Sequence, residues 1–579
     1  MTLPKASAAA AIDSPLHALQ GRWSGSLSLE SLYLAFADWL LHLLRSPGKR
    51  LDLLQLGLAQ ARQIEAFLLQ RAMREDGDTT PCTEVPANDR RFADPAWRQW
   101  PFDVLQQGFL LQQRWWHAAT TDVHGVSPHH QAVMDFVARQ WLDVLSPGNF
   151  LFTNPVVLER TQQEGGQNLL RGSLNWMDDV VRYLSGAASP GAEHFVVGRD
   201  VAATAGRVVL RNPLIELIQY APATERVHPE PILLVPAWIM KYYVLDLSPG
   251  NSLIRHLVAH GYTVFCISWK NPGRSDAGLG MDDYLRLGVY AALDAIGAVL
   301  PQRRVHAVGY CLGGTLLSIA AAAMARNTDQ RLASLTLLAA QTDFTEPGEL
   351  ALFIDESEIS LLEDQMAQSG YLTAVQMAGA FQMLRSYDLL WSRMVSDYLL
   401  GERRGMNDLM AWNADATRMP AVMHSQYLRR LYLHNDLAEG RYLVDGRPVE
   451  LKDIAVPVFC VATETDHVAP WPSVYKVHHL FTDEVTFVLT SGGHNAGIVS
   501  EPGHPGRSFR VLVRPRGAQT LARDTWLSRG EHREGSWWTA WLAWLDTRSG
   551  APEPPPSMGL PGAMPNELPP APGQYVFEK

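Results

Sequence analysis

The segment RVHAVGYCLGGTLLSIAAAA, residues 304–323, predicts a buried strand, a tight turn and a helix in immediate succession. Cys311 stands at the turn, between Gly309 and Gly313. In a turn this sharp, a side chain at either glycine would collide with the adjoining strand or helix. The helix that follows would direct its N-terminal N–H groups at the cysteine, which favours a thiolate. We therefore interpret Cys311 as a nucleophile rather than a structural cysteine.

Short apolar runs that alternate with helical segments surround this turn from about residue 196 onward. The runs are RVVL (207–210), LIELIQY (214–220), PILLVPA (231–237), YTVFCISW (262–269), RVHAVGY (304–310), LTLLAA (335–340), PVFCVAT (457–463) and VTFVLT (485–490). Strands buried on both faces read this way, so the pattern predicts an α/β fold, a mostly parallel sheet with helices on both faces. The G-x-C-x-G turn resembles the nucleophile elbow of α/β-hydrolases, with cysteine in the serine position.

An acid and a histidine follow the later strands, in the order that the hydrolase elbow requires. PVFCVATETDHVAPW (457–471) ends a predicted strand with Glu464, Asp466 and His467, and VTFVLTSGGHNAG (485–497) ends the next with His494. Open α/β sheets keep their sites at the carboxyl ends of strands. We predict a triad of Cys311, Asp466 and His494, with Glu464 as the competing acid because Asp466 lies further into its loop.

Backbone N–H groups are expected to form an oxyanion hole beside this nucleophile. One donor is the N–H of Leu312, the residue after Cys311. The second should come from the loop after residue 235, around Trp238 or Ile239, and we select Ile239. The alternative for this loop is simple packing on the core.

The chain predicts several regions besides the catalytic domain, which we place at residues 191–549. Residues 1–28 are expected to be disordered or loose, and residues 29–190 show helical periodicity, as in LESLYLAFADWLLHLLR (29–45). An insertion at about 343–447 breaks the strand and helix alternation and is expected to form a lid over Cys311, or else a structural decoration. Residues 550–579 form a Pro-rich tail, an extended wrap or loose end.

Composition restricts the classes of partner. The formal net charge of -11 disfavours nucleic acid and anionic membranes. Four separated cysteines (Cys82, Cys266, Cys311, Cys460) make no disulfide framework, and a poor N-terminal signal fits a cytoplasmic protein. We find no transmembrane segment, no metal-ligand spacing and no P-loop or dinucleotide fingerprint, so we expect neither a metal nor a cofactor.

Several segments in matching order resemble the polyhydroxyalkanoate synthases, which polymerise (R)-3-hydroxyacyl-CoA. They are DRRFADPAW (89–97), LSPGNFLFTNP (145–155), PAWIMKYYVLDLSPGNSLIRHLVAHGYTVFCISWKNP (236–272), GMDDY (280–284), GYCLGGT (309–315), WNADATRMP (412–420) and TDHVAPW (465–471). The resemblance implies Cys311 as acylated nucleophile, Asp466 as acid, His494 as base and an accessory, loop-orienting role for His467. It also implies the single-subunit type, a homodimer, and a location at the surface of polyester granules. Asn495 departs from the apolar residue usual after the histidine.

The chemistry of a thiol agrees with this resemblance. Attack on a CoA thioester exchanges one thioester for another, and transfer to a 3-hydroxyl group then gives the more stable oxyester. His494 would move the protons and Asp466 would orient it. CoA enters and leaves as part of the substrate and product. The alternatives are a cysteine-dependent thioesterase or polyester depolymerase of the same fold, and a granule-surface binding protein with weak activity.

Overall fold

The computed structural model describes residues 8–73, 80–86, 89–562 and 568–579, and it divides into two compact units. The sheet unit consists of Met1–Ser26, Pro190–Met377 and Met406–Lys579. The helical unit consists of Leu27–Ser189 and Ala378–Gly405. The predicted insertion at 343–447 therefore contributes to both units, since its middle part belongs with the N-terminal helices.

A ten-stranded sheet forms the centre of the sheet unit, in the order β1-β2-β6-β3-β7-β8-β13-β14-β15-β16. The strands are β1 (Gly206–Arg211), β2 (Ile215–Tyr220), β3 (Ile232–Val235), β6 (Val264–Trp269), β7 (Val305–Tyr310), β8 (Leu332–Leu338), β13 (Val458–Thr463), β14 (Val485–Thr490), β15 (Ser508–Arg514) and β16 (Glu531–Glu534). The strands from β6 to β14 in this order pair in parallel, and the outer pairs are antiparallel. Every residue of β3, β6, β7, β13 and β14 is buried, which explains their continuous apolar runs.

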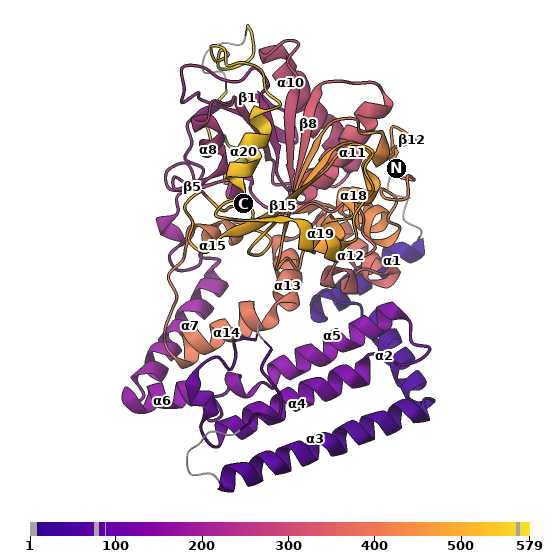
Figure 1. Ribbon diagram of the computed structural model, residues 1–579, viewed down its shortest axis with the longest axis vertical. Coiled ribbons are helices and arrows are strands. Elements are labelled where there is room, and N and C mark those ends of the chain that lie inside the picture. The colour runs from indigo at the N-terminus through magenta and orange to yellow at the C-terminus, as the bar shows by residue number, and fades with distance from the viewer. Residues whose placement is uncertain (1–7, 74–79, 87–88, 563–567) are drawn as a thin grey trace. The chain divides into compact units, whose positions relative to one another are not determined.

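Helices cover both faces of this sheet, so the predicted α/β fold is confirmed. Figure 1 shows α8 and α20 on one side of the sheet and α10 and α11 on the other. The helices of the unit are α1 (Ala8–Trp23), α8 (Leu253–Ala259), α9 (Met281–Asp283), α10 (Ala291–Val299), α11 (Leu312–Arg326), α12 (Glu356–Ser369), α15 (Asp408–Asn413), α16 (Ala421–Tyr427), α17 (Trp471–Val474), α18 (Val477–Leu480), α19 (Arg523–Arg529) and α20 (Trp538–Asp546). Short two-stranded ribbons complete it: β4 (Asp246–Ser248) with β5 (Asn251–Ser252), β9 (Tyr371–Leu372) with β10 (Met419–Pro420), and β11 (Leu443–Val444) with β12 (Arg447–Pro448). The alanines of α11 let the helix lie close to β7, and the helix is buried from Leu312 to Met324.

Both ends of the chain pack on the sheet unit. Part of the N-terminal stretch expected to be loose forms α1, where His17 Nδ1 lies 2.8 Å from Asp364 Oδ2 of α12; residues 1–7 lie outside the described residues. An alanine-rich segment forms a stable helix when tertiary contacts support it, and α12 supplies them here. In the tail, Pro570 bridges to Arg207 of β1, so this part of the tail is an extended wrap.

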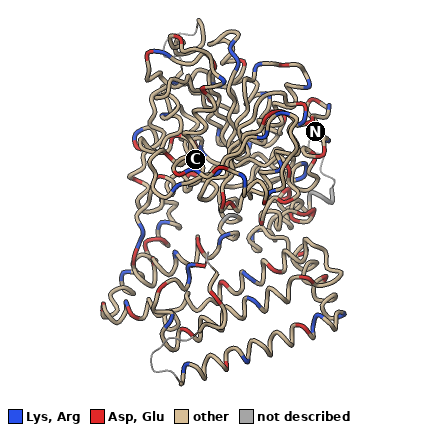
Figure 2. The backbone as a smooth tube through the Cα atoms, viewed as in Figure 1, with Lys and Arg blue, Asp and Glu red and all other residues tan. Residues whose placement is uncertain are grey.

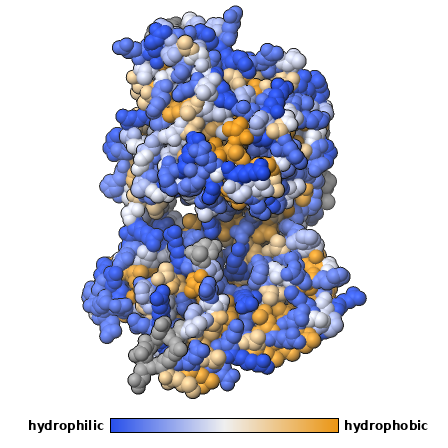
Figure 3. Space-filling view, in the orientation of Figure 1, coloured by the Kyte–Doolittle hydropathy of each residue, from blue (hydrophilic) through white to orange (hydrophobic). Residues whose placement is uncertain are grey.

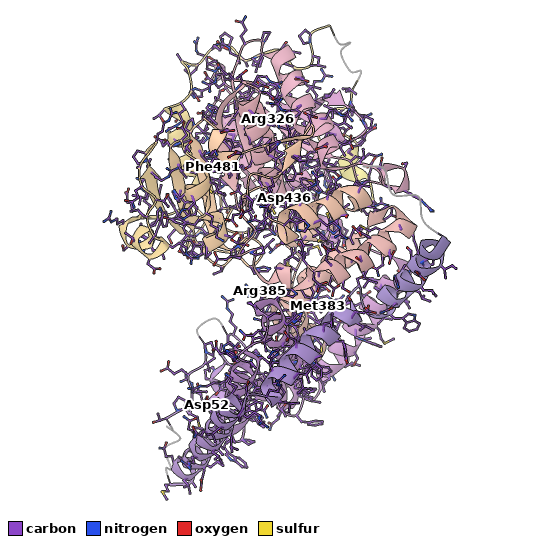
Figure 4. All side chains as sticks on the ribbon, turned by 90° about the vertical axis from the view of Figure 1, so that its right-hand side faces the viewer. Asp52, Arg326, Met383, Arg385, Asp436 and Phe481 are labelled. Carbon is purple, nitrogen blue, oxygen red and sulfur yellow. The ribbon has the colours of Figure 1, made fainter. Side chains whose placement is uncertain are left out.

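The helical unit is built from α2 (Leu29–Leu44), α3 (Pro47–Met73), α4 (Phe102–Thr120), α5 (Pro128–Val144), α6 (Pro155–Gln163), α7 (Gln167–Ser185), α14 (Ser392–Met394) and most of α13 (Ala374–Leu384). Inside it, Arg91 forms ion pairs with Asp89 at 2.7 Å and Asp143 at 2.9 Å, and its guanidinium stacks on Tyr387. Figure 4 labels Met383 and Arg385 in the insertion segment that this unit contains.

The surface mixes both signs of charge with apolar residues. Figure 2 shows acidic and basic residues interspersed along both units, and Figure 3 shows apolar residues gathered over helices of the helical unit. Within the described part of the chain, no helix has the length and hydropathy needed to cross a bilayer.

Candidate active site

Cys311 occupies the sharp turn between β7 and α11. Its backbone has φ 53° and ψ -123°, a region that non-glycine residues rarely adopt. Its N–H donates to the carbonyl of Leu338 at 2.8 Å, which fixes the turn to the end of the neighbouring strand β8. The residue is only 8% exposed. The strand, strained turn and helix are those predicted from the sequence.

The glycines around Cys311 are confined by backbone atoms. An added Cβ would lie 2.3 Å from the Cα of Gly314 if placed on Gly309, and 2.0 Å from the carbonyl oxygen of Val235 if placed on Gly313. Gly314, which the sequence reasoning did not single out, is equally confined, because its Cβ would lie 2.4 Å from that of Ala340. Neither backbone atoms nor the Cβ of an alanine can move away as the end of a flexible side chain does, so the turn needs glycine at these positions.

Asp466 and His494 meet at one edge of the sheet. They follow β13 and β14, which pair in parallel, so their loops emerge side by side. The Nδ1–H of His494 donates to Asp466 Oδ2 at 2.7 Å, and Cys311 contributes to raising the pKa of the same imidazole. The structure therefore pairs His494 with Asp466, whereas Glu464 is exposed to solvent, and the triad with Cys311 stays a prediction.

The carboxylate of Asp466 has a fixed orientation. Its Oδ1 accepts hydrogen bonds from the backbone N–H groups of Val468 and Ala469, both at 2.8 Å. Its Oδ2 accepts from Thr463 Oγ1 at 2.9 Å in addition to His494. The side chain of Asp466 has no exposed surface. Each oxygen thus has two donors, and only Oδ2 faces the imidazole.

The electrostatics favour an imidazolium at His494. Burial opposes the charge of Asp466, but His494 and the two backbone donors hold the pKa of this carboxyl below its usual value. Burial also opposes a charge on His494, yet Asp466 and Cys311 together raise the pKa of the imidazole well above its usual value.

Three tyrosines that the sequence reasoning missed interact electrostatically with the candidate site. The ring of Tyr310 lies 5.7 Å from that of His494, and its hydroxyl donates to Asn495. From the insertion, the hydroxyl of Tyr427 donates to that of Tyr432 at 3.3 Å. Burial, with a smaller effect from the charge of Cys311, raises the pKa of both phenols.

A local widening of one helix pairs these two tyrosines. The helix α16 ends at Tyr427 and continues as a π-helical stretch, Leu428–Leu433. In such a stretch residues five apart lie on the same face, whereas an α-helix would separate them. The five-residue spacing of Tyr427 and Tyr432 therefore indicates that the two side chains pair only if the π-helical stretch is already known.

The loop after β3 lies against the start of α11, because a Cβ added to Gly313 would lie 2.6 Å from the carbonyl oxygen of Pro236. Leu312 is the first residue of that helix, so its N–H has no carbonyl partner within the helix. Trp238 is 2% exposed, and its ring centroid lies 5.0 Å from that of Tyr284, whereas Ile239 is half-buried. The role of Leu312 and Ile239 as oxyanion donors stays a prediction.

His467 follows Asp466 in the loop after β13 and is half-buried. Its carbonyl oxygen would lie 3.1 Å from a Cβ added to Gly348. This places the main chain of His467 against the beginning of the insertion, and its accessory role stays a prediction.

The other cysteines differ from Cys311 in their surroundings. Cys266 and Cys460 are fully buried within β6 and β13, and burial raises the pKa of both thiols. Cys82 lies in the helical unit and is half-buried. Among the residues that the structure describes, no group of three or more His, Cys, Asp or Glu is placed to hold a metal ion.

Comparisons with known proteins cover almost the whole chain. The family described as "Poly-beta-hydroxybutyrate polymerase (PhaC) N-terminus" matches residues 88–257, and "Poly-beta-hydroxybutyrate polymerase N terminal" matches residues 7–49. The description "alpha/beta hydrolase fold" matches residues 230–501, which confirms the predicted fold family.

Three relatives illustrate the similarity. The poly(3-hydroxyalkanoate) polymerase of Methylorubrum extorquens is 42% identical, over 86% of this chain and 82% of that one. The poly(3-hydroxyalkanoate) polymerase subunit PhaC of Rhizobium etli is 37% identical, over 87% and 79%. The protein of that name from Cupriavidus necator is 36% identical, over 92% and 90%. The chain therefore belongs to the poly(3-hydroxyalkanoate) polymerase family, acyltransferase-type enzymes built on the α/β-hydrolase fold.

Proposed function

We propose that this chain polymerises (R)-3-hydroxyacyl-CoA into a polyester with release of CoA, through an acyl thioester on Cys311. The observation that carries the proposal is the buried pair of His494 and Asp466, with the pKa of the imidazole raised by Asp466 and by Cys311 at the strained turn. The relatives named poly(3-hydroxyalkanoate) polymerase support the class of substrate.

In the loading step, the thiolate of Cys311 attacks the carbonyl carbon of the CoA thioester. The bond between that carbon and the CoA sulfur breaks, and the imidazolium of His494 gives its proton to the departing CoA thiolate. One thioester replaces another, so the step is nearly thermoneutral and the acyl group stays activated.

In the elongation step, His494 acts as the base. Loading removes the charge of Cys311, one of the contributions that raise the pKa of His494. The neutral imidazole then takes the proton of the 3-hydroxyl group of a second hydroxyacyl-CoA, whose oxygen attacks the acyl carbon. The bond to the Cys311 sulfur breaks, and thiolate and imidazolium form again. Asp466 accepts from Nδ1 throughout and keeps Nε2 directed at the reacting atoms.

Both steps pass through a tetrahedral oxyanion. We assign its stabilisation to the backbone N–H groups of Leu312 and Ile239, which act without cost in reorganisation when they are held in place. CoA is part of the substrate and product, and the proposed cycle uses no further cofactor.

Water must be kept from the acyl-cysteine, because hydrolysis would end the chain. Cys311 is only 8% exposed, and its charge contributes to raising the pKa of Tyr427 and Tyr432 of the insertion. We assign the insertion at 343–447 the role of a lid that moves to admit substrate and release polymer. Hydrogen exchange within this insertion should change when a non-reactive acyl-CoA analogue binds, and unchanged exchange would contradict the lid.

The test of the activity uses (R)-3-hydroxybutyryl-CoA with the unaltered chain, Cys311→Ala and Cys82→Ser. We expect CoA release with insoluble polyester from the unaltered chain and Cys82→Ser, and neither from Cys311→Ala. Mass spectrometry should find the acyl group on Cys311. Free acid without polymer would favour the hydrolase alternative, and absence of CoA release would favour a binding protein.

The surface of the helical unit suggests where the product attaches. Leu51, Leu54 and Leu58 lie on one face of α3, and each is more than half exposed. We propose that these apolar residues help to hold the enzyme, a cytoplasmic homodimer, on the polyester granule. Replacing the three leucines with glutamine should reduce granule binding without loss of CoA release, and the control Asp52→Ser with Gln55→Ser should change neither. Light scattering tests the dimer.

A further inference from the structure

The Pro-rich tail ends in a segment that is fixed to the sheet unit. Buried Glu216 of β2 accepts hydrogen bonds from the backbone N–H groups of Gln574 and Tyr575, at 2.8 and 2.9 Å. Val576 follows with 1% exposure and belongs to the hydrophobic core. Residues 574–578 are therefore an anchored element rather than a loose end.

This segment satisfies a buried lysine at the end of the loop 238–241. Lys241 is 3% exposed, and its Nζ donates to the carbonyl of Glu578 at 2.7 Å and to that of Tyr575 at 3.3 Å. The backbone N–H of buried Asn271 donates to the carboxylate of Glu578 at 2.9 Å, which holds the end of the segment. A buried ammonium group needs such partners, because its transfer from water is costly without them.

The same loop is also held by residues 412–418 of the insertion. Trp412 Nε1 donates to the carbonyl of Lys241 at 2.7 Å, and Thr417 Oγ1 donates to that of Trp238 at 2.8 Å. Met240 forms a backbone bridge with Ala416. The loop is thus held between two elements, one from the insertion and one from the tail.

The position of this loop relative to Cys311 is tightly determined. A Cβ on Gly313 would lie 2.0 Å from the carbonyl oxygen of Val235 and 2.6 Å from that of Pro236, so the loop begins in direct contact with α11. From there it leads to Ile239, the assigned second oxyanion donor. A displacement of about 1 Å at a catalytic group can cost about 100-fold in rate.

We infer that the tail segment 574–578, acting through Lys241, positions the loop 238–241 so that the N–H of Ile239 faces the developing oxyanion. Lys241 and Glu578 are then positioning residues for acyl transfer. This inference rests on the proposed function, because these contacts position an oxyanion donor only if Cys311 is acylated.

The test compares Lys241→Met, a chain that ends at Gly573, and the two changes combined. Glu553→Gln is the matched control, since it weakens an ion pair of the tail with Arg303 away from the loop. Two rates are measured: CoA release, which needs the oxyanion donors, and alkylation of Cys311 by iodoacetamide, which does not.

We expect kcat for CoA release to fall about 10- to 100-fold in Lys241→Met, with KM within about threefold, because the donor is displaced rather than removed. The rate of Cys311 alkylation by iodoacetamide should stay within about twofold of that of the unaltered chain. The combined variant should be no slower than the slower single variant, because both changes break one linkage. Glu553→Gln should match the unaltered chain.

Two results would overturn the inference. One is a Lys241→Met variant with unchanged kcat, and the other is an alkylation rate that falls in parallel with kcat, which indicates a general loss of structure. If the chain that ends at Gly573 does not fold, Lys241→Met still decides the matter. Failure of the unaltered chain to release CoA would instead refute the proposed function.

Discussion

Replacement of Asp466 with asparagine changes one atom of a side chain whose orientation is already fixed. The oxygen that accepts from Val468 and Ala469 must remain an oxygen, since an amide NH2 group cannot accept those N–H bonds. The NH2 group of the new amide therefore faces His494 and donates to Nδ1. That forces the imidazole proton onto Nε2, toward Cys311, where a base needs a lone pair.

The expected loss follows from this reversed tautomer. His494 also loses the charge and hydrogen bond of Asp466 that, together with Cys311, outweigh its burial, so its pKa falls and the imidazolium is no longer favoured. The same reversal in a Ser-His-Asp triad costs about 10,000-fold. We expect kcat to fall about 1,000- to 10,000-fold, or about 4 to 5.5 kcal/mol of transition-state stabilisation. KM should change little because the side chain of Asp466 has no exposed surface.

The assay is steady-state release of CoA, with single-turnover acylation of Cys311 and a thermal melt as a test of folding. The matched control is Glu464→Gln, the exposed carboxylate on the same loop, which should keep at least half of the activity. The reasoning is refuted if Asp466→Asn retains more than about a tenth of kcat, or if Glu464→Gln loses as much.

Three further outcomes test the packing and the buried charges. Gly309→Ala places a Cβ 2.3 Å from the Cα of Gly314, so we expect the free energy of unfolding to fall by at least about 1–3 kcal/mol in denaturant titrations; an unchanged midpoint contradicts the steric argument. Arg91→Leu leaves Asp143 without its 2.9 Å ion pair and should destabilise the helical unit by about 3–5 kcal/mol, where a loss below about 1 kcal/mol speaks against a structural role. Burial lowers the pKa of Lys241 from 10.5 to about 8, so between those pH values the unfolded chain binds more protons. The free energy of unfolding of the unaltered chain, relative to that of Lys241→Met, should therefore rise by about 3 kcal/mol from pH 8 to 10.5. A difference that does not change with pH would exclude a buried charge at Lys241.

The central sheet and the residues at its edge could be predicted from the sequence because their signals are local. A strand buried on both faces must be apolar throughout, and the turn at Cys311 must have glycine on both sides. The histidine and the acid follow their strands directly, so the order of strands and loops was enough to bring Asp466 and His494 together. Which loop residues donate to an oxyanion is a matter of backbone orientation, and the pattern at Trp238 and Ile239 left it open.

Other features could not be predicted because they depend on contacts between distant segments. The pairing of Tyr427 with Tyr432 needs a π-helical stretch, which the residue pattern does not predict. The tail has no hydrophobic periodicity, so its sequence does not indicate that Val576 is buried in the core. It also does not indicate that Lys241 donates to the carbonyl of Glu578. The N-terminal helix α1 likewise depends on α12, which follows it by more than 300 residues.

The division of the insertion between two units determines when the helical unit can be completed during synthesis. Asp143 accepts a hydrogen bond from Ser386, and the carbonyl of Leu399 accepts one from Asn168. The N-terminal helices are therefore synthesised well before the residues that they contact. The ribosome adds about 5–20 residues per second, and the interval between residues 189 and 405 therefore lasts about 10 to 40 seconds. Throughout that time the newly made helices lack these partners, and binding of a chaperone to them would protect the unfinished unit.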